Sequence, residues 1–492
     1  MKVILVYLEP LDNEPLGLMY IGTVLKKEGF DVKIVGLPKR NKENYLLKEI
    51  RTFSPEVIGI SIVTPLFDIA QNIASFIKKQ FPKMLIIAGG PHPTIMPYET
   101  LKEKNIDICV LGEAELTVVE LLKAISKKED LRKIKGIAFL EGNEFVVTPS
   151  QELIEDLDSL PFVDRELMPK NVIYGRAGYP IGNPCMLLIT GRGCPFNCSF
   201  CQPTVRKMFG SKPRRRSVEN VIEEIIQLKN KYGINGLWIN DDTFLIDRIW
   251  INKFCDYLIK EKIEIMWYAN GRINNPDEGI LKKMRDAGCV GLVMTPETGS
   301  QRIRNEILNK RINDEEIFKA YKICKKIGLP FQANIMFASP TETEEDLKLS
   351  LSLIKKIQPH FMNLSYTTAL PATYLYERYL PEIKKSIYYR NYSDFDIGKF
   401  KKLDCNINDK YLKKIHRFFE KYYYKESFCN RARHFLQYPY FRKILYKRWK
   451  TLLFSEYPNF LHLIYDIISI ILGLFPYFVN KHIYKSSDEI NS

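Results

Sequence analysis

Two long stretches of the chain alternate between short apolar runs rich in β-branched residues and longer segments with helical spacing. In the first stretch, residues 1–130, the expected helices are Leu16–Glu28 and Asp68–Gln80. The expected strands are Val3–Tyr7, Val32–Val35, Val57–Ile62, Met84–Ala88 and Ile108–Leu111. Because these strands are apolar throughout and helices separate them, the pattern predicts a parallel, doubly wound (Rossmann-like) α/β sheet.

The length of 492 residues and the composition fit a globular protein of about three domains. The predicted limits are 1–140 for the doubly wound domain, 141–180 for a linker, 181–390 for a second α/β domain and 391–492 for a basic, aromatic, mostly helical C-terminal region. The ten cysteines are scattered apart from one close trio, which favours a reducing cytoplasm over a secreted disulfide scaffold. The apolar run Met1–Leu8 is too short for a signal peptide, so we expect none.

Ligands of doubly wound sheets bind beyond the carboxyl ends of the strands, so the loops there form a candidate binding edge. One of these loops begins with Gly89 and Gly90, which let the backbone approach a ligand closely or simply make a tight turn. His92 follows, either as a ligand contact or as a locally hydrogen-bonded loop histidine. Gly89, Gly90 and His92 are the candidate binding residues of this domain.

The most informative motif is the trio Cys194, Cys198 and Cys201, which follows the apolar strand Met186–Ile189. Thiolates are the usual ligands of iron–sulfur clusters, which normally take four, so three cysteines leave one iron open for chemistry. A zinc site would need a fourth cysteine or histidine, and the nearest other cysteine, Cys185, lies before the strand. The spacing therefore predicts a cluster with one vacant coordination position.

The stretch Gly191–Cys201 (GRGCPFNCSFC) resembles the signature of radical S-adenosylmethionine (SAM) enzymes. PLGLMYIGTVLKKEGFDV, AGGPHPTIMP and CVLGEAE together resemble the cobalamin-binding domain that precedes many of these enzymes. The resemblance implies a [4Fe–4S] cluster on the trio, SAM bound to the open iron, and cobalamin on the first domain. It also implies that an electron from the cluster cleaves SAM to a 5′-deoxyadenosyl radical, which abstracts hydrogen from an unactivated carbon.

The next 170 residues repeat the strand–helix rhythm, and the resemblance implies a partial (β/α)6 barrel with functional residues at the strand carboxyl ends. The expected strands are Gly236–Asn240, Ile265–Ala269, Val290–Met294, Phe331–Phe337 and Phe361–Tyr366, with helices starting near Val218, Arg248, Asp277, Gln301, Asp314 and Glu344. By resemblance, the SAM-binding residues are Phe200, Asp241, Asp242, Glu297 and Ser300. The alternatives are a helix cap by Asp242 or Thr243, and a Glu297 that merely faces a helix N-terminus.

The chain departs from the family pattern in three places. No Asp-x-His-x-x-Gly segment is present, so any bound cobalamin is expected to lack a protein histidine as its lower ligand. Non-glycine residues stand where relatives have glycine, at Ala338, Thr341 and Ala372, which indicates a divergent subfamily with an intact cluster motif. The run Arg214–Arg216 either attracts an acidic group of the substrate or belongs to a solvated loop.

The C-terminal region combines positive charge, aromatic residues and an apolar segment. Residues 410–450 contain 13 Lys and Arg against 2 Asp and Glu, within a net charge of +15. Phe460–Val479 approaches the length of a bilayer span, but His462, Asp466 and Pro476 interrupt it, which favours an interfacial helix. Attachment to an anionic membrane face and packing over the barrel fit this pattern equally well; nucleic-acid binding ranks below both.

The leading functional hypothesis is a cobalamin-linked radical SAM methyltransferase that acts on an unactivated carbon of a hydrophobic or lipid-like small molecule. A reductant such as ferredoxin or flavodoxin would supply the electron, and the location would be cytoplasmic or peripheral on the cytoplasmic membrane face. The alternatives are an anaerobic oxidative cyclase of the tetrapyrrole type and a cofactor-sensing, membrane-associated protein without turnover. Methylthio transfer is disfavoured because residues 1–150 contain one cysteine, Cys109, and that branch uses further cluster cysteines there.

Overall fold

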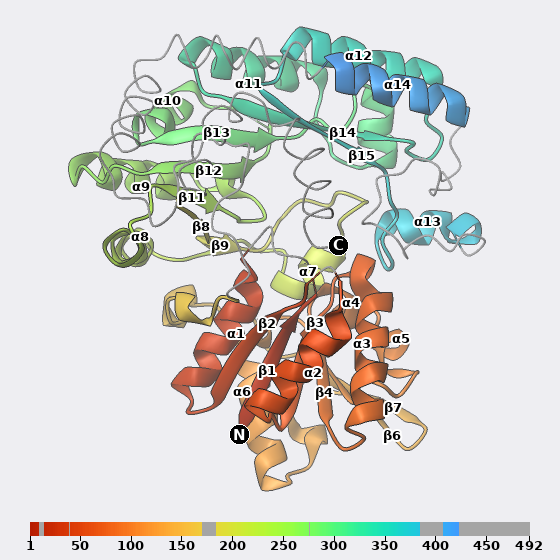
Figure 1. The fold of residues 1–492 in the computed structure, drawn as a ribbon. Helices are drawn as coiled ribbons and strands as arrows, with labels where there is room; N and C mark the ends of the chain where they lie inside the picture. Colours follow the sequence, from red (N-terminus) through yellow and green to blue (C-terminus); the bar gives the residue numbers. More distant parts are fainter. Residues whose placement is uncertain (9–13, 39, 170–183, 275, 384–406, 423–492) are drawn as a thin grey trace, which may run out of the picture.

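A computed structural model describes residues 1–8, 14–38, 40–169, 184–274, 276–383 and 407–422. Figure 1 shows two α/β domains, the first in red to orange and the second in green to blue, with helix α7 (Thr204–Phe209) between them. This architecture confirms the predicted fold class of both domains. Of the C-terminal region, helix α14 (Asp409–Tyr422) is described; the predicted apolar helix at 460–479 lies outside the described residues.

The first domain is built on a seven-stranded sheet with the order β2-β1-β3-β4-β5-β6-β7. Five strands are parallel: β1 (Lys2–Tyr7), β2 (Asp31–Gly36), β3 (Val57–Ser61), β4 (Leu85–Gly89) and β5 (Ile108–Val110). Both ends of each strand lie within one residue of the predicted limits. The hairpin of β6 (Ile137–Glu141) and β7 (Glu144–Val147) extends the sheet in the antiparallel sense. The order reverses about β1, which places the expected ligand crevice outside the carboxyl ends of β1 and β3.

Helices cover both faces of this sheet. The helices α1 (Leu16–Lys27) and α6 (Ala114–Lys127) pack on one face, and α2 (Lys42–Phe53) and α3 (Phe67–Gln80) on the other. Side chains of β1 alternate between the two layers, because Val3 and Leu5 join the first group and Ile4 and Val6 the second. Burial on both faces explains why the strand sequences are apolar throughout.

The second domain is a six-stranded parallel sheet in the order β15-β14-β13-β12-β11-β8. Its strands are β8 (Cys185–Leu188), β11 (Gly236–Ile239), β12 (Met266–Gly271), β13 (Cys289–Met294), β14 (Phe331–Phe337) and β15 (Phe361–Tyr366). The connecting helices are α8 (Val218–Tyr232), α9 (Arg248–Lys260), α10 (Glu278–Asp286), α11 (Asp314–Ile327) and α12 (Glu344–Ile357). The helix expected near Gln301 begins there, and its residues Ile303–Ile307 form a short π-helical turn.

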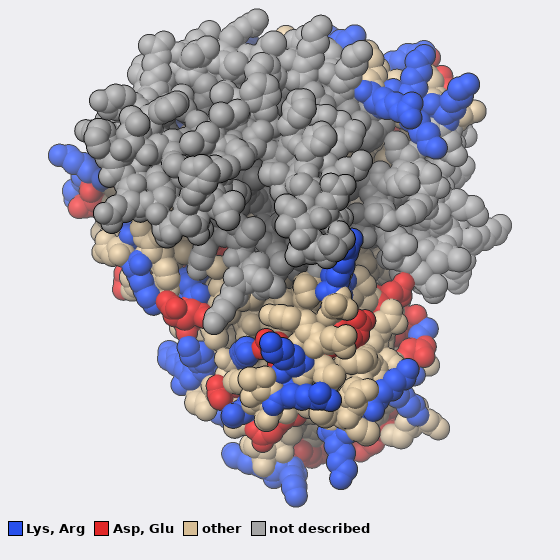
Figure 2. Space-filling model, in the orientation of Figure 1, with Lys and Arg blue, Asp and Glu red and all other residues tan. Residues whose placement is uncertain are grey.

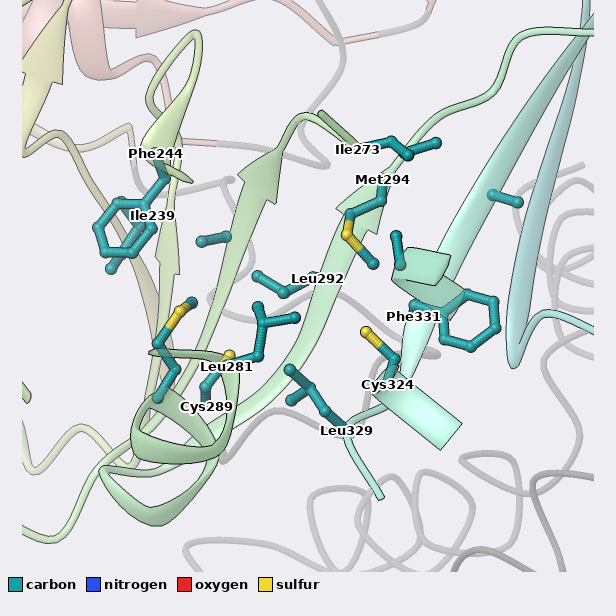
Figure 3. Close-up of a cluster of buried hydrophobic side chains, with 14 of the residues drawn as sticks. Ile239, Phe244, Ile273, Leu281, Cys289, Leu292, Met294, Cys324, Leu329 and Phe331 are labelled. Carbon is teal, nitrogen blue, oxygen red and sulfur yellow. The ribbon is translucent and has the colours of Figure 1, made fainter. Parts of the chain in front are cut away.

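The core of the second domain lies between this sheet and its helices. Figure 3 shows side chains from β11, β13 and α10 meeting there, among them Ile239, Leu292 and Leu281. Cys289 and Cys324 belong to this core, and their thiols are buried. The connecting helices thus cover one face of the sheet, and a second group of buried apolar side chains lies on the opposite face.

Two segments outside the sheets also pack tightly. Residues 148–169, within the predicted linker, bury Ile154 and Leu157 and insert Leu167 into the core of the first domain. In α14, Leu412 and Ile415 are buried in the core of the second domain, so this part of the basic region packs over the barrel. Figure 2 shows Lys and Arg interspersed with Asp and Glu on the visible face of the first domain. Among the described helices, none has the length and apolarity to cross a bilayer.

Candidate active site

The cysteine trio lies on the loop that follows β8 and the two-residue strand β9 (Gly191–Arg192). Cys198 is buried, whereas Cys194 and Cys201 are partly exposed. The backbone N–H of Ser199 donates to the carbonyl of Leu308 at 3.0 Å, which ties the loop to the π-helical turn. This hydrogen bond anchors the loop that carries the three thiols.

Two cations that the sequence analysis did not single out lie beside the trio. The guanidinium of Arg272 lies 3.9 Å from the ring centre of Phe196 and donates a hydrogen bond to Cys198 Sγ at 3.4 Å. Lys310 is buried and forms an ion pair with Glu297. The pKa of Cys198 falls to about 6, because the next cysteine of the trio donates a hydrogen bond to its sulfur and both cations favour the thiolate.

The trio fits a [4Fe–4S] cluster better than a single metal ion. Within the residues that the structure describes, no three His, Cys, Asp or Glu side chains converge as the ligands of one ion do. In a [4Fe–4S] cluster each cysteine binds a different iron, so the three sulfurs need not meet at one point. Cys185 is the first residue of β8, at the end of the strand away from the loop. The positive charges of Arg272 and Lys310 complement the negative charge of a thiolate-bound cluster.

The loop after β9 that carries the cysteine trio is called the cluster loop from here on. Asp241 and Asp242, the acids expected near SAM, both lie against it. The carboxylate of Asp241 is buried and accepts hydrogen bonds from the N–H of Thr190 at 2.7 Å and of Gly191 at 3.1 Å. Asp242 is exposed and accepts from the N–H of Gly193 at 3.2 Å. Neither acid caps a helix. Thr243 holds the N-cap position of the 3-10 turn Phe244–Ile246 without a side-chain hydrogen bond, and Asp247 caps α9. Asp241 is therefore occupied by the loop backbone, and Asp242 is the acid that stays open to a ligand.

The other residues expected at SAM are spread over three environments. Glu297 is joined to the trio through Lys310, and its backbone adopts a left-handed φ of 64°. The hydroxyl of Ser300 donates to Asp346 at 2.5 Å, at the start of α12. The Phe200 ring packs in an apolar cluster with the π-helical turn and α13 (Tyr374–Ile383). The structure thus brings Glu297 to the cluster loop and gives Ser300 a hydrogen-bond partner in the helical layer.

The glycine replacements keep the backbone that glycine would favour. Ala338, Thr341 and Ala372 have φ values of 54°, 62° and 59°, all in the left-handed region. Each such residue costs roughly 1–2 kcal/mol relative to a right-handed conformation. The turns at the ends of β14 and β15 therefore retain their shape although their side chains differ from the family pattern.

The expected acid-attracting or solvated role of the arginine run is wrong. The side chains of Arg214, Arg215 and Arg216 are 3%, 9% and 5% exposed, and each forms a buried ion pair. Their partners are Glu113, Asp241 and Glu224 respectively. A buried charge without a partner is costly, so these arginines are structural groups that face inward.

The candidate binding residues of the first domain lie at the carboxyl end of β4. Gly90 has a φ of 98°, and a Cβ there would lie 3.1 Å from the carbonyl oxygen of Ile62. At Gly89 a Cβ would meet nothing closer than 3.8 Å. Only Gly90 therefore needs to be glycine for the loop to keep its course beside β3.

His92 is buried behind this loop. Its Nδ1 lies 3.2 Å from the hydroxyl of Thr64, and its ring centre lies 4.2 Å from that of Phe67. Nε2 is buried without a hydrogen-bond partner among the described residues. Burial lowers the pKa of His92 to about 4, so the ring is neutral near pH 7. A buried, unpartnered nitrogen at a ligand edge is a candidate hydrogen-bonding contact for the cofactor.

The ligand edge of the first domain and the cluster loop of the second domain meet at α7. Helix α4 (Pro91–Ile95), which carries His92, packs against α7, the helix that begins three residues after the trio. A Cβ at Gly112, beyond β5, would lie 3.6 Å from the carbonyl of Lys207 in α7. The two candidate cofactor sites therefore face a common boundary.

Comparisons with known proteins identify both domains. Residues 3–122 match the B12 binding domain, and residues 188–354 match the Radical SAM superfamily. An uncharacterized methyltransferase of Pyrococcus horikoshii is 32% identical over 82% of this chain and 86% of its own length. An anaerobic magnesium-protoporphyrin IX monomethyl ester cyclase of Cereibacter sphaeroides is 28% identical over 78% of this chain and 62% of the cyclase. A hopanoid C-3 methylase of Methylococcus capsulatus is 24% identical over 81% of this chain and 75% of its own length.

A solved structure shares the two-domain fold. The radical SAM methyltransferase TsrM of Kitasatospora setae, with cobalamin and a [4Fe–4S] cluster bound, superposes with a TM-score of 0.65 at 19% identity. The match covers 77% of this chain and 78% of TsrM.

The fold and the cysteine loop define a radical SAM enzyme with a cobalamin-binding domain. The chain belongs to the cobalamin-dependent radical SAM family that includes methyltransferases, and its cofactors are a [4Fe–4S] cluster, SAM and cobalamin. This membership confirms the resemblance read from GRGCPFNCSFC and from the first domain, and it sets aside the alternative of a protein without turnover.

Proposed function

We propose that this enzyme transfers a methyl group from SAM to an unactivated carbon of a hydrophobic, lipid-like small molecule. The meeting of the two cofactor sites at α7 carries the proposal, because methyl transfer needs both cofactors near one substrate. When bound, the cluster supplies the electron that cleaves SAM, and cobalamin carries the methyl group. A reductant such as ferredoxin or flavodoxin provides that electron.

The protein side chains would hold and orient these groups. Cys194, Cys198 and Cys201 bind three irons and leave the fourth for SAM. Glu297, paired with Lys310, and Asp242 lie beside the cluster loop, where they would bind the charged end of SAM. On the first domain, the Gly89–Gly90 backbone and the buried, unpartnered His92 Nε2 would contact cobalamin.

The face of the second sheet opposite its helices supports a hydrophobic substrate. Trp238 and Tyr268 lie on this face with ring centres 4.8 Å apart. The same apolar cluster contains Cys185, Met266 and Val290. These side chains are buried in the structure, and a substrate that took a place against such an apolar wall would bury carbon surface, at about 25 cal/mol per Å². The relative named as a hopanoid methylase is consistent with a lipid-like substrate.

A contact with membranes would suit such a substrate. We propose that the C-terminal region provides it, on the support of the 13 Lys and Arg against 2 Asp and Glu in residues 410–450. Basic segments of this kind gain about 1 kcal/mol per charge near an anionic surface. Loss of binding to anionic vesicles after truncation at Tyr422, which keeps the packed helix α14, would test this, with SAM cleavage as the control for an intact barrel.

The test of the reaction itself uses isotope-labelled SAM. Reconstituted enzyme with cobalamin, a low-potential reductant and SAM carrying a trideuterated methyl group is incubated with separate lipid and aqueous extracts of the producing cells. The proposal predicts 5′-deoxyadenosine, S-adenosylhomocysteine and a lipid-fraction product that contains the label. Label only in the aqueous fraction would overturn the lipid-like substrate, and an unlabelled product that has lost hydrogen would favour oxidative cyclisation.

A further inference from the structure

The boundary between the two domains holds a group of charged side chains that the reaction chemistry does not use. Four acids and four bases lie there with side-chain exposures between 0% and 8%, and each acid pairs with at least one base. The acids are Glu14, Glu113, Glu115 and Glu224, and the bases are Arg165, Arg192, Arg214 and Arg216. Buried charges are costly unless they are paired, so pairs across the boundary form only when the domains are docked.

Glu113 is the centre of this group. It occupies the N-cap position of α6 without a side-chain capping bond, directly after the Gly112 turn at the carboxyl end of β5, on the ligand edge of the first domain. Its carboxylate accepts two hydrogen bonds from Arg214, both at 2.9 Å, one from Arg192 at 3.0 Å and one from the N–H of Ile154 at 2.9 Å. These bonds hold the pKa of Glu113 below its usual value against the opposing effect of burial. One carboxylate thus gathers groups from the first domain, the linker and the second domain.

Arg192 connects this carboxylate to the cluster. It stands two residues before Cys194, and it also pairs with Glu115 at 2.5 Å. The residue between them, Gly193, has a φ of 91°, and a Cβ there would lie 2.9 Å from the carbonyl of Lys212. Because this turn is so close-packed, a shift of Arg192 moves the first cluster ligand as well.

We propose that Glu113 and Glu115 are positioning residues, and that their ion pairs with Arg192 and Arg214 form an interdomain latch. The latch holds the cobalamin edge in register with the cluster loop, so that each SAM cleavage is coupled to transfer of a methyl group. The coupling part of this inference rests on the proposed function, whereas the latch itself rests on the contacts. A displacement near 1 Å at a reacting centre can cost about a hundredfold in rate, which is why such a latch matters.

Glu115→Gln and Glu113→Gln test the latch, with Glu141→Gln as the matched control. Glu141 also pairs with an arginine, Arg132, but its side chain is 61% exposed on the β6–β7 hairpin. Amide hydrogen exchange of residues 109–117 and 187–194 is measured on the loaded, full-length protein. The latch predicts at least tenfold faster exchange there in each latch variant, normal iron and cobalamin content in Glu115→Gln, and no change in Glu141→Gln.

The second readout is the ratio of 5′-deoxyadenosine to methylated product. Loosened docking should raise this ratio at least tenfold in Glu115→Gln while SAM cleavage continues. If the enzyme makes no methylated product at all, the proposed function fails, and the exchange measurement still decides the latch. Exchange and product ratio equal to those of Glu141→Gln would overturn the inference.

The double variant Glu115→Gln/Arg192→Gln separates electrostatics from general damage. Removing Glu115 alone leaves a buried arginine short of one partner, and removing both leaves the bidentate Glu113–Arg214 pair intact. If charge pairing is the cause, exchange in the double variant should be slower than in Arg192→Gln alone. Faster exchange in the double variant than in either single variant would show that the side chains act by packing alone and would sink the latch.

Discussion

The two cofactor-facing loops of this enzyme are built in opposite ways. The cluster loop is held by charged and polar side chains, with Asp241 beneath it and Arg272 and Lys310 beside its sulfurs. The cobalamin-side loop after β4 begins with glycine, proline and one neutral, buried histidine, and the hydroxyl of Thr94 supplies its side-chain hydrogen bonds to the backbone of Gly90 and Gly112. A charged cluster with an open iron calls for electrostatic partners, whereas a large neutral cofactor surface calls for backbone that approaches closely. The difference predicts that side-chain changes damage the first loop and backbone changes damage the second.

The largest effect is expected from the cluster ligands. Changing Cys194, Cys198 or Cys201 to Ala removes one thiolate from a site with no spare cysteine on its loop. Each variant should lose its iron and sulfide after anaerobic reconstitution and should not cleave SAM. Cys289→Ala and Cys324→Ala are the controls, because both residues are buried in the hydrophobic core. A normal cluster in any variant of the trio would contradict the assignment.

On the cobalamin side, the matching change is Gly90→Val. A β-branched residue at φ 98°, with its Cβ 3.1 Å from a backbone carbonyl, forces the loop to move. We expect the variant to purify without cobalamin yet to assemble a full cluster. Gly142→Val is the control, since Gly142 also has a positive φ, of 62°, but has open space around its Cα. Equal cobalamin content in the two variants would contradict the claim that the backbone at Gly90 is needed for cobalamin binding.

Much of the fold could be predicted because the strands are buried on both faces. The apolar runs of β1 to β5 and β11 to β15 stand out against helices with regular spacing, and their limits were predicted to within two residues. The helix α2 was missed because it buries just Leu46 and Ile50 and is otherwise polar. The β6–β7 hairpin was missed because its strands are short and its second strand has no buried residue. Weak burial leaves a weak pattern.

The candidate site was less accessible to prediction because its contacts are distant in sequence. Asp241 accepts hydrogen bonds from Thr190 and Gly191, some 50 residues earlier, so nothing local shows that it is occupied. Lys310 reaches the trio through the fold, and its segment carried no recognised motif. Arg272 had a usable signal, since it follows directly on a strand end, where barrels place functional residues. The buried ion pairs of Arg214–Arg216 had no signal in the sequence that could have predicted them.

The two domains should also differ in how pH affects them. In the second domain, burial raises the pKa of Glu342 to about 8. The native state keeps this proton while the unfolded chain releases it above about pH 4.5, so stability falls as pH rises from 4.5 to 8. Between pH 6 and 9 the loss is about 3 kcal/mol. Glu342→Gln should remove it, and a thermal unfolding midpoint with the same pH slope as wild type would contradict this.

In the first domain, His92 has the opposite dependence. Its native pKa of about 4 lies below the usual 6.5. Between these two pH values the histidine is protonated in the unfolded chain and neutral in the native state. Stability is therefore lost as pH falls from 6.5 to 4, by about 2 kcal/mol between pH 7 and pH 5. His92→Gln should flatten this slope without changing the axial ligation of bound cobalamin. Loss of nitrogen hyperfine coupling in the cobalamin spectrum of the variant would instead show that His92 is a ligand.

The smallest effect tests whether the cations beside the trio act on the cluster or merely hold the loop. Reduction adds an electron to the cluster, and the positive charge and the N–H···S contact of Arg272 stabilise that electron. Arg272→Gln removes both, so the midpoint potential should fall by about 50 mV, close to tenfold in a one-electron equilibrium. Arg248→Gln, an exposed arginine at the start of α9, is the control and should shift the potential little. Arg272→Lys keeps the charge but loses the planar stacking on Phe196, so a wild-type potential in this variant would assign the effect to charge. A wild-type potential in Arg272→Gln, together with a reduced iron content, would show that Arg272 supports the loop and does not tune the cluster. The two cofactor-facing loops would then differ in how their side chains pack, and not in their electrostatics.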